Sequence, residues 1–353
     1  MKPALDADRY VSPSPARSEG PLPLNQPQVE QWRSEGYVLV DGVLPAALVD
    51  RVATTARAHF PAAGSAEATT INDFGSAVNF PNRLDGFNEI TLHPRIIGAC
   101  AQLLDRPATG LRLSQSDLWP KYGRAEPSPG MLDNQDQRIH VDYPNHTLAH
   151  PSPWDRPEAV EMIIYLDEVD DCGGSTAVVP RQGPDDPAYR WPIVDSPGIA
   201  DLNYINDRHH AEAYLAEQRP GLALWRQTLY ERERWTRFSP GTILFYRHDT
   251  WHRGTPMIPS TRRLVHNITY RRAECEWIST LHVGWAWKAY RADKYLERLI
   301  ATSSLDQRAV LGFPQPDDEY WCDETIEAVV ARHGVFGFDP APYRDALATR
   351  NGT

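Results

Sequence analysis

Hydrophobic and polar residues recur with two different periods along the chain, and the period changes near residue 110. Before that point, apolar residues follow the three- and four-residue spacing of an amphipathic helix in residues 44–60 and 94–104. A shorter helix is predicted for residues 27–36, which have a proline in the first turn and a glycine at the end. The first third of the chain is therefore predicted to be mainly helical, with a short β-type run at residues 37–40.

From residue 111 onward, the chain consists mostly of short runs of β-branched and aromatic residues, separated by clusters of Gly, Pro and Asp. We predict strands at residues 111–119, 138–143, 159–166, 175–179, 242–246 and 264–270. Helical periodicity returns at residues 286–301 and 323–333. The pattern indicates a mainly β fold with flanking helices, in which the strands form an antiparallel sandwich or barrel.

Three segments lie outside this core pattern. Residues 1–26 are rich in Pro, Ser and Asp, so we expect a flexible N-terminal arm ahead of a single domain of residues 27–353. Residues 181–238 form a long insert, either a lid over a site or an excursion that packs its own aromatic residues. Residues 277–353 form a helical extension, either a packed tail or a contact in a homodimer.

Composition narrows the classes of function. The 353 residues include 36 Lys and Arg against 47 Asp and Glu, a net charge of −11, which argues against a nucleic-acid partner. The four cysteines form no Cys-x-x-Cys pair, which argues against a thiolate zinc site or a disulfide framework. No apolar run approaches the roughly 20 residues of a membrane helix, and no signal pattern opens the chain. We therefore expect a cytoplasmic protein that acts on a small molecule.

The sharpest chemical feature is a His-x-Asp pair, His140 and Asp142, in a predicted strand. Residues two apart in a strand point to the same face, so the imidazole and the carboxylate would lie side by side. A third ligand could come from His252, which follows the predicted strand 242–246. Two histidines and one carboxylate with open positions are typical of non-haem Fe(II) oxygenases, although zinc accepts the same ligands. A surface His–Asp hydrogen bond is the simpler alternative for the pair alone.

A second feature follows shortly after His252, where Arg262 and Arg263 open the next predicted strand. A 2-oxoglutarate cosubstrate needs a cation for its distal carboxylate, and the planar guanidinium binds a carboxylate with two hydrogen bonds. A turn near residue 259 and a returning strand would bring Arg263 back beside the metal. The spacing leaves open whether Arg262 has this role, or whether both arginines are solvent-exposed.

Together these pieces resemble the phytanoyl-CoA dioxygenase family, over about residues 111–270. The pieces that match in order are Gln115 to Lys121, His140 to Tyr143, residues 172–180, residues 241–246, residues 251–256 and Arg263. The resemblance implies a double-stranded β-helix core, the cupin-like jelly roll, at about residues 111–272. Departures from the family pattern lie after the distal histidine and at residues 180–183, and none removes a ligand.

The resemblance also implies roles for individual residues. It implies that Fe(II) is held by His140, Asp142 and His252. It further implies that 2-oxoglutarate binds Arg263, with Gln115 and Thr255 as helpers. The implied reaction uses dioxygen to hydroxylate the substrate, and 2-oxoglutarate is decarboxylated to succinate and CO2. Halogenating members have a small residue in place of the carboxylate of Asp142, so halogenation is disfavoured.

The sequence leaves several interpretations of the site open. Tyr143, His146 and Lys121 are candidates for substrate contact, or else ordinary structural residues. The same iron site could perform desaturation, epoxidation or cyclisation. A cupin-like zinc hydrolase or isomerase is the alternative from another class, and a non-catalytic binding module is a third. The arginines and tryptophans of the insert suggest a bulky, partly anionic substrate.

Overall fold

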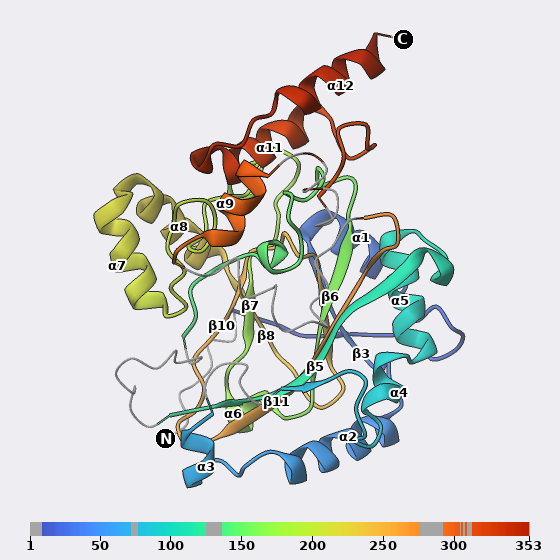
Figure 1. Cartoon of the computed structure of the whole chain (residues 1–353). Coiled ribbons are helices and arrows are strands. Elements are labelled where there is room, and N and C mark those ends of the chain that lie inside the picture. The colour runs from blue at the N-terminus through green and yellow to red at the C-terminus, as the bar shows by residue number, and fades with distance from the viewer. Residues whose placement is uncertain are drawn as a thin grey trace.

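The computed structural model describes residues 9–71, 77–124, 136–275, 292–303, 305, 308 and 313–352, and it contains two β-sheets with helices around them (Figure 1). The seven-stranded sheet has the order β2 (Ser14–Pro15), β3 (Tyr37–Asp41), β9 (Ile243–Tyr246), β6 (Ala159–Tyr165), β11 (Arg262–Arg272), β5 (Leu111–Tyr122), β4 (Val78–Asn79). The four-stranded sheet has the order β1 (Tyr10–Val11), β8 (Arg234–Thr236), β7 (Thr176–Val178), β10 (His252–Gly254). The pairs β2–β3 and β1–β8 are parallel, and the other described pairs are antiparallel.

The helices form three groups around the sheets (Figure 1). The N-terminal group comprises α1 (Gln26–Glu35), α2 (Ala46–His59), α3 (Ala66–Thr69), α4 (Phe87–Thr91) and α5 (Pro94–Leu104). The middle group comprises α7 (Arg208–Gln218) and α8 (Pro220–Arg232), and the C-terminal group comprises α9 (Tyr295–Thr302), α11 (Asp323–His333) and α12 (Ala341–Asn351). The short helix α6 (Val169–Cys172) lies apart from these groups, at the bottom of Figure 1. Short 3-10 turns lie at η2 (Ala108–Gly110), η3 (Tyr143–Asn145), η4 (Pro187–Tyr189) and η6 (Gly334–Phe336).

The sequence specifies the predicted helices in two ways: apolar residues define the buried face, and capping residues define the ends. Helix α1 begins at a capping box, in which Asn25 and Gln28 exchange side-chain to backbone hydrogen bonds. It ends at Gly36, whose φ of 93° is accessible to glycine at little cost. Helices α5 and α11 have the predicted bounds, and α2 lies within its predicted range. Part of the predicted helix 286–301 lies outside the described residues, and α9 falls in the rest.

The two faces of the seven-stranded sheet differ, because side chains alternate along each strand. The outer face packs against the N-terminal helices and forms the largest apolar cluster, which includes Leu118, Met162, Phe245 and Ile268. The inner face looks toward the four-stranded sheet, and its apolar cluster also includes Val178 of β7. One apolar core thus lies between the two sheets, and a second core lies under the helices.

Two features differ from the sequence-based expectations. Within the predicted arm, β1 pairs with β8 and β2 pairs with β3, so residues 10–15 add a strand to each sheet. Residues 138–143 form no ladder beyond one bridge, between His140 and His252. Backbone hydrogen bonds outweigh the Pro- and Ser-rich composition in the first case, and the insert replaces a neighbouring strand in the second. In the described part of the chain, no helix is long and apolar enough to cross a bilayer.

Candidate active site

Three predicted metal ligands, His140, Asp142 and His252, meet at one point. One donor atom from each lies within 4.8 Å of the donor atoms of the other two. His252 Nε2 is 3.1 Å from Asp142 Oδ2, and His140 Nε2 is 3.4 Å from Asp142 Oδ1. The centroids of the two imidazole rings are 4.4 Å apart. Two ring nitrogens and one carboxylate therefore converge, as a three-ligand metal site requires.

Backbone contacts fix the orientation of both imidazoles. His140 and His252 exchange two backbone hydrogen bonds of 2.9 Å each, so the two ligands are held side by side. Nδ1 of His140 lies 2.9 Å from the carbonyl of Arg138, and Nδ1 of His252 lies 2.9 Å from the carbonyl of Thr250. A neutral imidazole that donates from Nδ1 can present its Nε2 lone pair to a metal, whereas an Nε2 that keeps its proton can donate to a carboxylate; in both residues Nε2 faces Asp142.

The electrostatics around the triad favour a charged carboxylate. Burial opposes ionisation of Asp142, but the charge of His252 and hydrogen bonds from both imidazoles hold its pKa well below the usual range. Burial, followed by the neighbouring His252, lowers the pKa of His140 to about 4. The hydroxyl of Tyr246 donates a hydrogen bond of 3.1 Å to Asp142 Oδ2, and this bond orients the carboxylate.

A polar layer lies directly behind the carboxylate of Asp142. His146 Nε2 is 3.2 Å from Glu161 Oε1, and both side chains are buried. Burial opposes protonation of His146, but the carboxylate of Glu161 outweighs it and raises the pKa of the imidazole. His146 thus faces the metal side of the sheet, on a turn that follows Asp142.

Arg263 is a buried cation whose described surroundings leave it largely unsatisfied. It is 3% exposed, and its guanidinium donates a hydrogen bond to the carbonyl of Gly174. Its Nε has no hydrogen-bond partner, and within the described residues no carboxylate lies within 4.0 Å of the guanidinium. Burial lowers the pKa of Arg263. A buried cation without a counter-ion is costly, so this position fits a carboxylate ligand.

Two consecutive glycines, Gly173 and Gly174, form the loop whose carbonyl contacts Arg263. Gly173 and Gly174 both have a φ of 66°, which side chains other than that of glycine rarely adopt. A Cβ added at Gly174 would lie 2.2 Å from Met257 Sδ. The glycines therefore allow the backbone carbonyl to approach the guanidinium closely.

The inner face of the sheet changes character along β5 and β11. At one end, Lys121 and Arg263 are neighbours in register; next come the apolar Trp119 and Val265. Further along, Asp117 pairs in register with Asn267, and both are polar. The next pair is Gln115 and Thr269, and Glu161 of β6 lies opposite Thr269. A cationic end and a polar end are thus separated by an apolar middle.

The other predicted residues have varied placements. Arg262 points away from the inner face and donates to the carbonyls of Phe60 and Pro61, so Arg263 alone of this pair faces the site. The amide of Gln115 donates to Asp117 Oδ2 at 2.7 Å. The hydroxyl of Thr255 donates to the carbonyl of Ser175 at 2.9 Å.

Two of the three substrate candidates lie on the inner side of the molecule. Lys121 is buried, and its amine lies 3.3 Å from the carbonyl of Thr255. His146 faces Glu161, as described above. Tyr143 instead points into an apolar cluster beneath the insert, where its hydroxyl donates to the carbonyl of Ile193. The three therefore do not form one surface.

Sequence reasoning missed Tyr246, Glu161 and Asn267, which lie on the inner face close to the triad or in register beside it. A signal was present for Glu161, which interrupts the otherwise apolar strand β6 at an inward position. Asn267 also lies at an inward position of β11, two residues after the buried Val265. A polar residue at a buried strand position needs a partner or a ligand. The Oδ1 atom of Asn267 is buried and has no hydrogen-bond partner in the described structure.

Comparison with known proteins gives one family. The family model described as "Phytanoyl-CoA dioxygenase (PhyH)" matches residues 32–264, which is more than half of the chain. No curated protein matches the sequence.

Several solved structures are similar in part. EvdO2 from Micromonospora carbonacea var. aurantiaca, complexed with 2-oxoglutarate, is 12% identical and has a TM-score of 0.49. The match covers 73% of this chain and 94% of the EvdO2 chain. The epimerase SnoN, in complex with Fe3+, alpha ketoglutarate and nogalamycin RO, is 19% identical and has a TM-score of 0.47. The match covers 72% of this chain and 88% of the SnoN chain. EctD from S. alaskensis, in its apoform, is 17% identical and has a TM-score of 0.44. The match covers 74% of this chain and 81% of the EctD chain.

Proposed function

Because the chain belongs to the phytanoyl-CoA dioxygenase family of iron- and 2-oxoglutarate-dependent dioxygenases, we propose that it hydroxylates a small organic molecule with 2-oxoglutarate as cosubstrate. The proposed iron ligands are His140, Asp142 and His252. The observation that carries the proposal is the pairing of this triad with a buried arginine, Arg263, that has no carboxylate partner in the described structure.

The triad fits Fe(II) by the chemistry of its donors. Two imidazole nitrogens and one carboxylate suit a borderline ion, and a set of three protein ligands leaves positions for cosubstrate and dioxygen. When bound, iron supplies the redox chemistry that couples dioxygen to the oxidative decarboxylation of 2-oxoglutarate to succinate and CO2. The protein contributes orientation: backbone carbonyls fix both imidazoles, and Tyr246 fixes the carboxylate of Asp142.

Arg263 is the proposed partner of the distal carboxylate of 2-oxoglutarate. The buried guanidinium, which has no carboxylate partner in the described structure, would then donate two charge-assisted hydrogen bonds to the cosubstrate. The apolar side chains of Trp119, Val265 and Tyr165 line the inner face beside it, where they exclude water and strengthen the ion pair. Gln115 and Thr255 remain proposed as additional residues for binding 2-oxoglutarate. In the structure, each donates a side-chain hydrogen bond to another residue of the protein.

For the substrate, we propose a small polar molecule that lies against the polar end of the inner face. Asn267 supports this proposal, because its buried Oδ1 accepts no hydrogen bond in the described structure. Two arginines of the insert pair with acids, Arg226 with Glu212 and Arg232 with Asp186, so these two give no support to an anionic substrate. Desaturation, epoxidation and cyclisation would use the same groups, and product analysis separates them from hydroxylation.

The proposed architecture is a double-stranded β-helix within a single domain of residues 27–353. Two features support it: the two sheets share an apolar core, and the triad lies on segments associated with the smaller sheet. The four-stranded sheet places β10, which begins with His252, beside β7.

The proposal is tested by anaerobic spectroscopy. Protein purified without oxygen receives Fe(II) and then 2-oxoglutarate, and the weak visible charge-transfer band of the chelated cosubstrate is recorded. We expect the band in wild type, no band in His252→Ala, and a requirement for far more 2-oxoglutarate in Arg263→Ala. Succinate formation in air then tests turnover.

A zinc hydrolase or isomerase predicts another pattern, because it has no use for 2-oxoglutarate. Metal-loaded wild type without the band, together with activity that does not depend on 2-oxoglutarate, would overturn the proposed function in favour of that class.

A further inference from the structure

The insert, residues 181–238, contacts both ligand-bearing segments from outside the site. Arg226 and Tyr230 of α8 and Glu233 just after it lie at i, i+4 and i+7, which places them along one side of the helix. Arg226 is 0% exposed, and Glu233 is 3% exposed. A helix that buries an arginine and a glutamate must provide partners for them, and these partners are next to metal ligands.

The first contact is with Ile139, the residue before His140. The backbone N–H of Ile139 donates to the hydroxyl of Tyr230 at 3.1 Å, and Arg226 donates to the carbonyl of Ile139 at 2.8 Å. Glu212 of α7 joins the two, because its Oε1 accepts from Tyr230 at 2.7 Å and from Arg226 at 2.8 Å. The insert therefore takes the place of a neighbouring strand and satisfies both backbone groups of Ile139.

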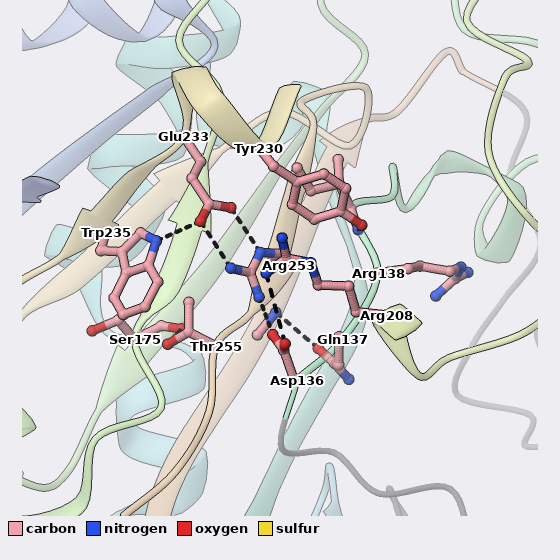
Figure 2. A network of polar contacts seen from close by, with 12 residues as sticks. Asp136, Gln137, Arg138, Ser175, Arg208, Tyr230, Glu233, Trp235, Arg253 and Thr255 are labelled. Carbon is pink, nitrogen blue, oxygen red and sulfur yellow. Dashed lines mark hydrogen bonds and ion pairs between the residues drawn. The ribbon is translucent and has the colours of Figure 1, made fainter. Parts of the chain in front are cut away.

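The second contact is with Arg253, the residue after His252. Glu233 accepts two hydrogen bonds from Arg253, of 2.7 and 2.8 Å, and Asp136 also pairs with this guanidinium. Figure 2 shows Arg253 between the two carboxylates, with the ring of Tyr230 beside it. Because side chains alternate along β10, Arg253 points outward when His252 points to the triad.

The third contact is with Trp251, the residue before His252. Its backbone N–H donates to the hydroxyl of Tyr189 at 3.1 Å, and its indole donates to the carbonyl of Ala188 at 2.6 Å. Tyr189 and Ala188 lie in η4, in the first part of the insert. Both neighbours of His252 and the neighbour of His140 are thus held by the insert.

We infer that the insert is a positioning element for the metal centre, in which Tyr230 and Glu233 hold the His140 and His252 segments at the spacing that the metal requires. This inference rests on the proposed iron site. The insert acts through the residues next to the ligands and contacts the outer side of their segments. His140 and His252 belong to segments with few strand partners, and their bridge would otherwise be supported on one side only.

The first test compares two tyrosine variants. Tyr230→Phe keeps the ring and removes the hydroxyl that accepts from Ile139. Tyr343→Phe is the matched control, because the hydroxyl of Tyr343 accepts from a buried arginine, Arg308, in the C-terminal group of helices. Fe(II) is titrated anaerobically against a competing chelator, and the energy of the 2-oxoglutarate band is recorded for each protein.

We expect Fe(II) to bind Tyr230→Phe roughly 10-fold more weakly than wild type, as for residues that orient metal ligands, with a shifted band. Tyr343→Phe should bind within about twofold of wild type at a similar loss of stability, about 1 kcal/mol for one hydrogen bond. Equal Fe(II) affinity in wild type and Tyr230→Phe would overturn the inference and leave the iron site intact. Failure of wild type itself to bind Fe(II) would instead overturn the proposed function.

A second measurement needs no variant. Coupling between two sites is reciprocal, so bound Fe(II) should slow amide hydrogen exchange in α8 and at residue 139. Helix α12 is the internal reference. Slowing in α8 beyond that in α12 supports the inference, and equal exchange in α8 with and without Fe(II) contradicts it.

Discussion

Two buried arginines, ten residues apart on neighbouring segments, have opposite surroundings. Arg253 lies on the outer side of β10, is 1% exposed, and pairs with Glu233 and Asp136. Arg263 lies on the inner side of β11, is 3% exposed, and bonds to one backbone carbonyl, that of Gly174. Burial raises the cost of both charges, but only Arg253 has carboxylate partners within the described structure.

The comparison separates a structural arginine from a ligand-binding one. An ion pair completed within the protein holds two parts of the chain together, here the insert and the segment of His252. A buried arginine without a carboxylate partner in the described structure, on the same inner side as the metal triad, is a candidate binding site for the carboxylate of another molecule. Substitutions of these two arginines and of the residues around them test whether Arg253 is structural and Arg263 binds a ligand.

The largest effect is expected from Arg253→Leu. This change leaves Glu233, which is 3% exposed, without its cation, and unpaired buried charges cost about 3–5 kcal/mol. Arg263→Leu removes a cation that has no counter-ion among the residues that the structure describes, so the free energy of unfolding of this variant should stay close to that of wild type. Denaturant unfolding of both metal-free variants measures the difference. Equal losses in the two variants would mean that Arg263 has a structural partner after all.

The next effect concerns stabilisation by cosubstrate. In Fe(II)-loaded wild type, 2-oxoglutarate at 100 times its Kd should raise the free energy of unfolding by about 2.7 kcal/mol, since it binds the folded state. At the same concentration, Arg263→Leu should gain far less. Anaerobic thermal unfolding provides the measurement. A full gain in Arg263→Leu would contradict the assignment of the distal carboxylate to this arginine.

Gly174→Ala should have an intermediate effect. The change places a side chain at a φ of 66° and brings a Cβ within 2.2 Å of Met257 Sδ, at a cost of about 1–3 kcal/mol. The carbonyl that orients Arg263 would shift, so the Kd for 2-oxoglutarate should rise as well. Gly183→Ala is the control, because its φ of 89° is similarly strained but no atom lies within 4 Å of the added Cβ. Equal Kd values in the two variants would separate Gly174 from cosubstrate binding.

The smallest effects come from the two partners of Arg253. Glu233→Gln should cost more than Asp136→Asn, because the side chain of Glu233 is 3% exposed and that of Asp136 is 20% exposed. For Asp136→Asn we expect less than about 1 kcal/mol, as for partly solvated pairs. Urea unfolding ranks the two, and the reverse order would show that the insert is not the main anchor of Arg253.

Much of the fold was accessible from sequence where burial is periodic. Helices α5 and α11 have the predicted bounds, and β6 and β9 lie within one residue of theirs, because their apolar residues repeat at helical or strand spacing. The triad was accessible for a different reason, since His140, Asp142 and His252 are residue types whose chemistry is specific even without exact secondary structure.

The rest depended on long-range contacts that no local pattern records. Helices α7 and α8 were not predicted, because α8 buries Arg226 and Tyr230 and so lacks a simple apolar stripe. The pairing of β1 and β2 was missed because residues 10–15 contribute backbone hydrogen bonds from a Pro-containing stretch. Which of Arg262 and Arg263 faces inward was fixed only by the register of β11 with β5.

The most direct test of the central claim compares 2-oxoglutarate with 2-oxopentanoate, which has the same chain length but lacks the distal carboxylate. Binding of each to Fe(II)-loaded protein is measured without oxygen, in wild type and in Arg263→Leu. Truncating one partner of a buried charge pair costs about 2–5 kcal/mol, so wild type should prefer 2-oxoglutarate by roughly 30-fold or more. Arg263→Leu should bind the two acids almost equally. A wild type that does not distinguish them, or a variant that keeps the full preference, would contradict the account.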